Sequence, residues 1–239
     1  MADTDYDVIV VGAGNAAACA AMAAQDVGAK KIVMLERAPE DEAGGNTRFT
    51  AGAMRVVYDG VEDIQKLVEL SDQEIEDTDF GTYTQDQFFD DIFRVTQFRT
   101  DPDMAEILVT HSLETLTWMR KKGIRFVPIY GRQAFKIDGK FKFWGGLTVE
   151  TNGGGPGLYE AQQEITKASG IETMFESRAM SLVFDGAKIS GVRVKQGGEI
   201  KELSCKSVVM ASGGFQANPE WRTRYLGPGW DLAKIRGTR

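Results

Sequence analysis

The sequence predicts an α/β fold, with a parallel sheet whose last crossover is an antiparallel β-meander and with helical insertions before it. Three observations support this prediction. Apolar, strand-like runs at residues 8–11 and 31–35 flank an Ala-rich helical run. Short β-type segments joined by Asp-Gly and Gly-Gly turns occupy residues 172–204. A wholly apolar strand follows at 207–211, as is typical of strands buried on both faces of a parallel sheet.

The N-terminal strand leads into a glycine-rich turn and then a helix that ends at Gly28. Gly12, Gly14 and Ala17 have the G-x-G-x-x-A spacing of a Rossmann-like dinucleotide site. Gly12 is expected to permit the sharp turn, Gly14 to let phosphate oxygens approach the main chain, and Ala17 to let the helix lie close to the sheet. The first N–H groups of the helix would then face an anion.

The second strand, residues 31–35, ends at Glu36, which stands 22 residues after Gly14. An acid at this position hydrogen-bonds the ribose hydroxyls of an adenine dinucleotide, and it disfavours the 2′-phosphate of NADP. The sequence therefore predicts a dinucleotide site. The alternative is a glycine-rich turn in an ordinary α/β core, with Glu36 in solvent.

Composition narrows the possible functions. The 239 residues suffice for one large domain or two small ones, and 42% of them are hydrophobic. A net charge of −7 argues against a nucleic-acid surface, so an anionic substrate would need local cations. Cys19 and Cys205 fit reduced thiols, and a lone histidine, His111, rules out a multi-histidine metal site, so no metal is expected.

No run reaches the roughly 20 apolar residues of a membrane helix, and residues 1–5 are acidic, without the basic region of a secretory signal. We therefore expect a cytoplasmic protein.

Two further glycine-rich stretches are candidate ligand contacts. Gly44, Gly45, Asn46 and Thr47 follow the second strand, and Asn and Thr can donate to carbonyl or phosphate oxygens. Residues 151–157 precede a helix predicted at about 158–169 and form another glycine-rich helix entrance. A plain turn at the first stretch and a flexible connector at the second remain open alternatives.

Residues 61–150 are expected to form a helical and hairpin insertion. The pattern predicts a short helix at 61–70, a solvated acidic loop at 71–83 and a helix with Thr84 as its N-cap. A strand at 125–129 and a hairpin around Asp138-Gly139 would follow.

Between these elements, one long helix is predicted, starting at Asp101-Pro102 and running through Lys122 to a stop at Gly123. Its buried stripe would contain Met104, Ile107, Leu108, Leu116 and Met119. His111 would lie on or beside that stripe as a packed, hydrogen-bonded residue with no catalytic role.

The C-terminal third has a strand at 172–175, three meander strands at 179–184, 189–195 and 200–204, and the apolar strand at 207–211. A final crossover made by a meander, where nicotinamide dehydrogenases use a helix, indicates a flavoprotein.

With these motifs in place, the chain resembles the flavoprotein subunits of the fumarate reductase and succinate dehydrogenase superfamily, and more narrowly the tricarballylate dehydrogenases. The stretch Gln216-Ala217-Asn218-Pro219-Glu220-Trp221-Arg222 gives the narrower match. The wider resemblance is carried by Gly12-Ala13-Gly14-Asn15-Ala16-Ala17, Glu36-Arg37-Ala38-Pro39, Gly44-Gly45-Asn46-Thr47 with Ala51-Gly52, Asn152-Gly153-Gly154-Gly155, and Ala211-Ser212-Gly213-Gly214-Phe215.

The resemblance implies a Rossmann-like FAD-binding domain. Glu36 would hold the adenosine ribose, and Ala179 would meet the adenine through its main chain. No histidine stands in residues 44–52, where the respiratory members bond flavin covalently, so non-covalent FAD is expected. The full set of expected cofactor contacts is Gly12, Gly14, Asn15, Ala16, Ala17, Glu36, Arg37, Ala38, Gly44, Gly45, Asn46, Thr47, Ala51, Gly52, Ala179, Ala211, Ser212 and Gly213.

The resemblance also implies an activity: a hydride moves between a C–C bond of a polycarboxylate and flavin N5. In the family the capping domain and the catalytic residues come later in the chain, so residues 1–239 are expected to be the N-terminal portion of the FAD-binding domain. No catalytic residue is assigned. The arginines that could contact an anionic substrate, although a structural role is more typical of each, are Arg48, Arg55, Arg132, Arg222 and Arg224.

A membrane-associated electron-transfer partner is implied as well. Two alternatives stay open: a fragment that binds a dinucleotide without turnover, and a related dehydrogenase for a steroid, an amino acid or another carboxylate.

Overall fold

A computed structural model describes residues 4–235 of the chain. It divides into two compact units, one made of Met1–Thr50 with Gly155–Arg239 and the other of Ala51–Gly154. Residues 61–150, which the sequence predicts as an insertion, all fall within the second unit. Each unit is described by itself below.

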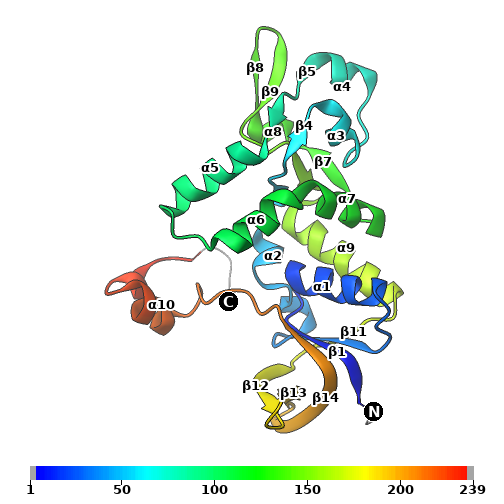
Figure 1. The fold of residues 1–239 in the computed structure, drawn as a ribbon, viewed down its shortest axis with the longest axis vertical. Coiled ribbons are helices and arrows are strands. Elements are labelled where there is room, and N and C mark those ends of the chain that lie inside the picture. Colours follow the sequence, from blue (N-terminus) through cyan, green and yellow to red (C-terminus); the bar gives the residue numbers. More distant parts are fainter. Residues whose placement is uncertain (1–3, 236–239) are drawn as a thin grey trace. The chain divides into compact units, whose positions relative to one another are not determined.

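The first unit is built on a six-stranded mixed sheet (Figure 1). Its strands β11, β2, β1 and β14 run parallel, and β14, β13 and β12 run antiparallel to one another. The α/β class and the parallel sheet with a meander crossover are therefore confirmed. In spatial order the strands are β11 (Glu172–Met174), β2 (Ile32–Leu35), β1 (Tyr6–Val11), β14 (Glu199–Met210), β13 (Ile189–Gln196) and β12 (Arg178–Phe184).

Strand β14 is one continuous strand of 12 residues, whereas two strands separated at 205–206 were predicted. Its first half pairs antiparallel with β13, and its second half pairs parallel with β1. The polar Lys206 does not interrupt it, because its ammonium reaches Asp7 at 2.6 Å. Figure 1 shows this strand curving out of the meander into the parallel sheet.

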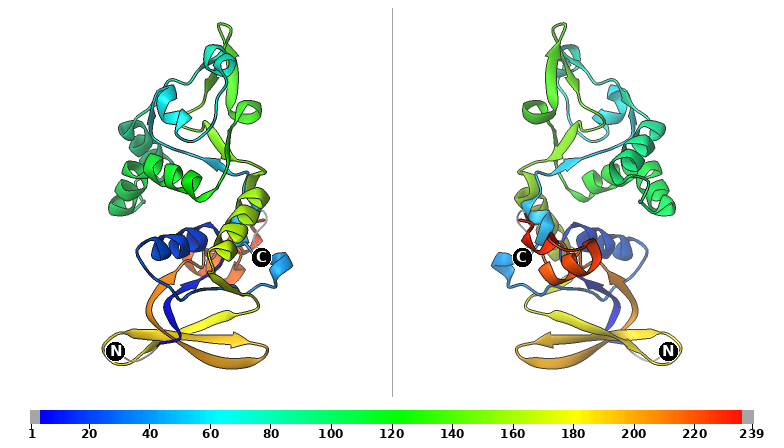
Figure 2. Two further views of the ribbon diagram at one scale, coloured as in Figure 1. Left: turned by 90° about the vertical axis from the view of Figure 1, so that its right-hand side faces the viewer. Right: turned by 90° about the vertical axis from the view of Figure 1, so that its left-hand side faces the viewer.

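The two faces of the parallel strands are covered differently. Helix α1 (Asn15–Asp26) buries its small side chains, Ala17 among them, against β1 and β2. The meander folds back over the other face, where Val192 and Val194 join Ile9 and Val33 in one apolar cluster. Figure 2 shows α1 and the meander on opposite sides of these strands. This two-sided cover is the reason why β1 and β2 are almost wholly apolar.

Helix α9 (Gly154–Ala168) begins four residues earlier than predicted, inside the glycine run. A Cβ at Gly155 would lie 2.3 Å from the carbonyl oxygen of Thr47 and 2.5 Å from that of Thr50. The N–H of Gly155 also donates to the Thr50 carbonyl at 2.9 Å. Close packing on this segment, which includes α2 (Gly45–Phe49), explains the glycine at 155.

The second unit contains short helices and three small sheets, with strand orders β3-β10-β7, β4-β6 and β5-β9-β8. The predicted hairpin forms around Asp138-Gly139, both with positive φ. The elements are β3 (Ala53–Met54), β4 (Tyr58–Asp59), α3 (Val61–Gln65), α4 (Asp72–Asp77), β5 (Thr78–Asp79), β6 (Thr82–Tyr83), α5 (Gln85–Thr96), α6 (Pro102–Thr110), α7 (Ser112–Lys122), β7 (Phe126–Pro128), α8 (Tyr130–Gln133), β8 (Ala134–Ile137), β9 (Lys140–Phe143) and β10 (Val149–Thr151).

The segment 71–83 is not a loop, as was predicted, but contains α4, β5 and β6. A capping box starts α4: the Ser71 hydroxyl accepts from the Glu74 N–H, and the Glu74 carboxylate accepts from the Ser71 N–H at 2.9 Å. The S-x-x-E spacing carries this signal in the sequence. The acidic composition of residues 71–83 favoured a solvated loop, and that interpretation was wrong.

The predicted long helix is two helices, α6 and α7, separated at His111. Asp101 caps its start and Gly123 ends it, as predicted. The predicted buried stripe is wrong in its first half, because Met104, Ile107 and Leu108 are 65%, 60% and 55% exposed. The buried positions form another stripe, which begins with smaller residues: Ala105, Val109, Ser112, Leu116 and Met119.

His111 is not packed in that stripe. Its side chain is exposed, and its Nδ1 lies 3.1 Å from the Glu114 carboxylate, which is also exposed. The predicted hydrogen bond is present and the predicted burial is wrong.

Candidate cofactor site

A pocket of about 720 Å³ opens in the first unit where β1, β2 and β14 end. Its wall includes Gly12 after β1, Glu36 after β2 and Ala211 after β14. The carboxyl ends of parallel strands are where open α/β sheets bind their ligands. The sheet therefore assembles at one edge the three segments that the sequence singled out.

The two glycines of the first turn are required for different physical reasons. Gly12 has φ +115°, and a Cβ there would lie 2.4 Å from the Ala211 carbonyl oxygen. Gly14 has φ −83°, which any residue adopts, but a Cβ there would lie 3.1 Å from Thr47 Oγ1. Gly12 thus serves the backbone turn, and Gly14 keeps space open beside the pocket.

The first turn of α1 offers main-chain donors. The N–H of Asn15 donates to Thr47 Oγ1 at 2.8 Å, and the N–H of Ala18 donates to the Gly14 carbonyl at 2.9 Å. Within residues 4–235, the N–H groups of Ala16 and Ala17 have no acceptor. Unpaired donors at a helix start favour an anion, and Ala16 itself lines the pocket.

The Asn15 side chain serves another purpose. Its Oδ1 accepts from Gln162 Nε2 at 2.6 Å, which joins α1 to α9. Asn15 nevertheless lines the pocket.

Glu36 is held at the end of β2 by its neighbours. Its N–H donates to the Met174 carbonyl at 2.9 Å, and its own carbonyl accepts from the Ser177 N–H at 2.7 Å. Its carboxylate accepts from the N–H of Ala38 at 3.0 Å. These bonds fix the main chain on both sides of an acid that lines the pocket.

The loop before α2 rests on Tyr159 of α9, a residue that sequence reasoning missed. Gly44 has φ +106°, and a Cβ there would lie 2.8 Å from the tyrosine ring. The guanidinium of Arg48 lies 5.8 Å from the same ring. Burial, followed by the negative charge of Glu36, raises the pKa of Tyr159 to about 12.

Most of the predicted cofactor contacts line this pocket, and four do not. Ala17 is buried against the sheet, and Ala38 supports the Glu36 carboxylate. Ala51 and Gly52 belong to the second unit, where a Cβ at Gly52 would lie 2.3 Å from Thr151 Oγ1. The lining residues from the predicted set are Gly12, Gly14, Asn15, Ala16, Glu36, Arg37, Gly44, Gly45, Asn46, Thr47, Ala179, Ala211, Ser212 and Gly213.

The pocket also includes residues that were not predicted. Ser177 precedes β12, Arg178 is its first residue, and a longer segment after Gly213 extends the wall to Trp221. Sequence reasoning selected Ala211, Ser212 and Gly213 as cofactor contacts, and it used residues 216–222 only as evidence for the narrower resemblance.

The arginines considered for an anionic substrate all have partners. Arg48 donates to the main-chain carbonyls of Asp41 and Ala43. Arg132 pairs with Glu150, and the guanidinium of Arg224 lies 5.7 Å from the Tyr225 ring. Arg222 is buried and donates to four main-chain carbonyls.

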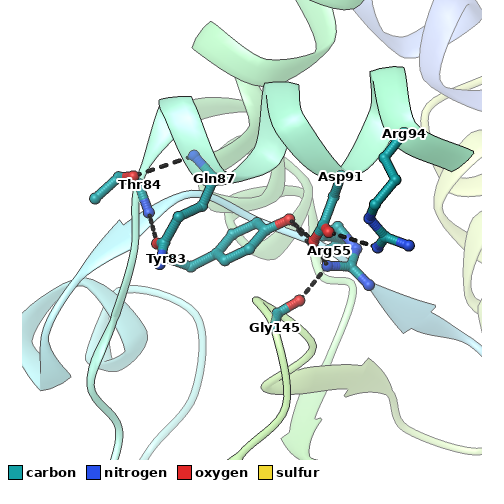
Figure 3. Close-up of polar contacts among 7 residues, drawn as sticks. All are labelled: Arg55, Tyr83, Thr84, Gln87, Asp91, Arg94 and Gly145. Atoms are coloured by element: carbon teal, nitrogen blue, oxygen red, sulfur yellow. Dashed lines mark hydrogen bonds and ion pairs between the residues drawn. The ribbon is translucent and has the colours of Figure 1, made fainter. Parts of the chain in front are cut away.

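Arg55 is the centre of a polar network in the second unit (Figure 3). It donates to the Tyr83 hydroxyl at 2.9 Å, to the Asp91 carboxylate at 3.1 Å and to the Gly145 carbonyl. Arg94 holds the other oxygen of Asp91 at 2.8 Å. These contacts tie the segment after β3 to β6, α5 and the turn at Gly145, which is a structural role.

The part of the chain that the structure describes gives little support for a metal site or a cysteine nucleophile. No three His, Cys, Asp or Glu side chains among these residues gather into a metal site. Burial raises the pKa of Cys19 to about 11, which disfavours a thiolate nucleophile. None of the helices in residues 4–235 has the length and apolar character that crossing a membrane requires.

The pocket residues fit an FAD-type dinucleotide. The turn at Gly12 to Gly14 and the unpaired N–H group of Ala16 suit a pyrophosphate, and the Glu36 carboxylate suits a ribose. Together they define a dinucleotide-binding α/β fold.

The family model of the FAD binding domain matches residues 7–232, and the chain belongs to that family. Its cofactor is therefore FAD. Membership in the fumarate reductase and succinate dehydrogenase superfamily, which the resemblance implied, is confirmed by this match and by the relatives below.

Individual relatives are named as reductases or oxidoreductases. The chain is 28% identical to an NADH:fumarate oxidoreductase of Klebsiella pneumoniae, with 94% of this chain and 22% of the relative covered. It is 27% identical to a fumarate reductase (cytochrome) of Shewanella frigidimarina (90% and 34% covered) and to a urocanate reductase of Eggerthella lenta (93% and 34% covered).

A solved structure, the open conformation of a flavocytochrome c3 fumarate reductase, is similar with a TM-score of 0.69 and 26% identity, covering 92% of this chain and 36% of that one. The chain spans between 22% and 39% of the length of the curated relatives that it matches.

Proposed function

We propose that this chain is the FAD-binding part of an oxidoreductase that acts on CH–CH groups, of the tricarballylate dehydrogenase and fumarate reductase type. The observation that carries the proposal is the pocket at the ends of β1, β2 and β14, in a chain of the FAD binding domain family. Relatives named fumarate reductase, urocanate reductase and vinyl phenol reductase support a reaction at a carbon–carbon bond.

In this proposal the residues of the chain bind and orient the cofactor. When bound, FAD supplies the chemistry of hydride transfer at N5, with a polycarboxylate such as tricarballylate as the other reactant. The glycine turn and the start of α1 hold the pyrophosphate without covalent attachment, and Glu36 holds the ribose. Cofactor position is therefore the contribution that these residues make to catalysis.

Substrate recognition is proposed to need more than these residues. A polycarboxylate requires guanidinium groups that are free to form bidentate pairs. Arg48, Arg55, Arg132, Arg222 and Arg224 each have partners already. This observation, with the coverage of less than two fifths of each relative, favours the second candidate: a unit that binds FAD without turnover on its own.

Electron transfer is proposed to involve a separate, membrane-associated redox partner, as the resemblance implies. A cytoplasmic location likewise stays a prediction from the sequence.

The experiment is purification of the chain, identification of its bound flavin, and turnover assays. Fumarate and urocanate are offered with a reduced viologen dye, and tricarballylate is offered with an oxidising dye. Turnover of tricarballylate supports the narrower proposal, and turnover of another substrate replaces it with a related dehydrogenase. Bound FAD without turnover supports the binding unit. A nicotinamide dinucleotide bound without flavin contradicts both.

A further inference from the structure

The wall of the pocket after β14 contains two aromatic side chains, Phe215 and Trp221. They are the only aromatic residues that line this pocket within the described part of the chain. They extend the wall beyond Ala211, Ser212 and Gly213. A pocket for a cofactor with two flat ring systems thus has one aromatic surface.

The indole of Trp221 is only partly covered by the neighbouring aromatic rings of Phe215 and Tyr225. Its ring centroid lies 6.0 Å from that of Phe215 and 5.9 Å from that of Tyr225, and Phe215 and Tyr225 are 5.6 Å apart. Even so, Trp221 is 47% exposed. An aromatic ring supported from behind and open towards a pocket is arranged to stack on a planar ligand.

The position of Trp221 is fixed by its helix. Trp221 lies in the first turn of α10 (Pro219–Leu226), where the Asn218 side chain accepts from the Trp221 N–H at 3.1 Å. The next residue, Arg222, is 5% exposed and donates to the carbonyls of Gln216 and Trp230, at 2.5 and 2.8 Å. A ring presented from such a rigid turn loses little conformational entropy on binding.

The part of FAD that meets this wall is inferred from the cofactor contacts that the family resemblance implies for the lining residues. Glu36 is expected at the ribose of the adenosine, and the resemblance implies that Asn46 and Thr47 of α2 approach the pyrophosphate and the flavin ring. The resemblance also implies that Ala211, Ser212 and Gly213 close over the adenosine side, and Trp221 belongs to the segment that follows them. Bases stack on aromatic side chains with useful affinity whatever their identity.

We propose that Trp221, backed by Phe215, stacks on the adenine of FAD and is a cofactor-binding residue. This inference rests on the cofactor of the family and not on the proposed reaction. An inactive protein would leave it unaffected, and a failed stacking test would leave the reaction unaffected.

The test uses ADP, which carries the adenine half of FAD and does not absorb tryptophan emission, so that a fluorescence change requires proximity. The full chain is freed of flavin, and the dissociation constants of FAD and ADP are measured for wild type, Trp221→Ala, Trp221→Phe and Trp144→Phe. Trp144 is an exposed tryptophan of the second unit and is the matched control. Circular dichroism reports whether each variant is folded.

We expect Trp221→Ala to weaken FAD and ADP to the same extent, by about thirtyfold, the middle of the range for one base–aromatic stack. Trp221→Phe should bind ADP within about twofold of wild type but lose the ADP-induced emission change, because another aromatic ring can still stack. Trp144→Phe should keep both. Unchanged ADP affinity in Trp221→Ala, or weakened FAD with unchanged ADP, overturns the proposal.

If Trp221→Ala does not fold, Trp221→Phe decides the question. A tryptophan emission change on ADP binding that persists in Trp221→Phe overturns the proposal. Loss of that emission change with ADP affinity retained supports it.

Discussion

The N–H of Asn15 donates a hydrogen bond of 2.8 Å to Oγ1 of Thr47, a residue 32 positions further along the chain. The same oxygen lies 3.1 Å from where a Cβ would stand on Gly14. A side chain of α2 thus satisfies one of the unpaired donors at the start of α1, as a capping residue does. The sequence pointed to Thr47 as a cofactor contact, and the structure gives it a second role in shaping the turn.

Replacing Thr47 by Val keeps the shape of the side chain and removes the acceptor. The Asn15 N–H then loses its partner, and we expect a loss of about 1 kcal/mol in the free energy of unfolding, with several-fold weaker FAD binding. Urea unfolding and FAD titration measure the two effects. Thr47→Ser retains the hydroxyl and should behave like wild type. Equal stability of Thr47→Val and wild type would show that this bond contributes nothing.

Glu36→Ala tests the ribose contact. A hydrogen bond to a charged acceptor contributes about 1.5–3 kcal/mol, so FAD should bind roughly ten- to a hundredfold more weakly or slightly worse. Glu36→Gln keeps an acceptor for the Ala38 N–H and should fall between wild type and Ala. Equilibrium titration with FAD gives the three dissociation constants. Unchanged affinity in Glu36→Ala would mean that Glu36 does not contact the cofactor.

The parts of the fold that short patterns encode were predictable. Strand β1, the turn at Gly12 and helix α1 are adjacent in the chain, and their residue types are fixed by local geometry. The hairpin at Asp138-Gly139 is equally local, because its turn requires two residues that tolerate positive φ. In such segments the same local backbone geometry determines both the residue types and the structure.

Contacts between distant residues were not predictable in this way. The stripe of α6 and α7 uses Ala105 and Val109, and a pattern search weights larger apolar residues such as Met104 instead. The support of Gly44 by Tyr159 and the placement of Trp221 in the pocket wall depend on packing between separate elements. No spacing within one element encodes them.

The two glycines of the turn should respond differently to Ala. Gly12→Ala places a Cβ 2.4 Å from the Ala211 carbonyl at φ +115°, so we expect a loss of stability of about 3 kcal/mol or more. Gly14→Ala brings a Cβ to 3.1 Å from Thr47 Oγ1 and 3.4 Å from the Gly44 carbonyl oxygen with ordinary φ, so its effect on folding should be below about 1 kcal/mol. Thermal unfolding without flavin compares them. Equal losses would contradict the different roles assigned to the two positions.

The tyrosines predict a stability that falls at alkaline pH. Burial, as the largest cause, raises the pKa of Tyr6, Tyr58, Tyr83 and Tyr159 to about 12, from the ordinary value of 10. Between pH 10 and 12 the unfolded chain has released these protons while the folded chain keeps them. Since the folded state then binds more protons, the free energy of unfolding is at its full value below pH 10 and decreases through this window.

Two matched variants separate burial from hydrogen bonding. The hydroxyl of Tyr58 donates to the Phe80 carbonyl at 2.8 Å, whereas the buried hydroxyl of Tyr159 has no hydrogen-bond partner among the described residues. Tyr58→Phe should therefore cost about 1 kcal/mol at neutral pH, and Tyr159→Phe should cost nothing or stabilise slightly. Each variant should also remove one of the late-titrating phenols from a tyrosinate absorbance titration of the folded protein. If Tyr159→Phe were destabilised as much as Tyr58→Phe, its hydroxyl would have to be hydrogen-bonded in solution, to water if not to the chain, because a buried donor without a partner stabilises nothing.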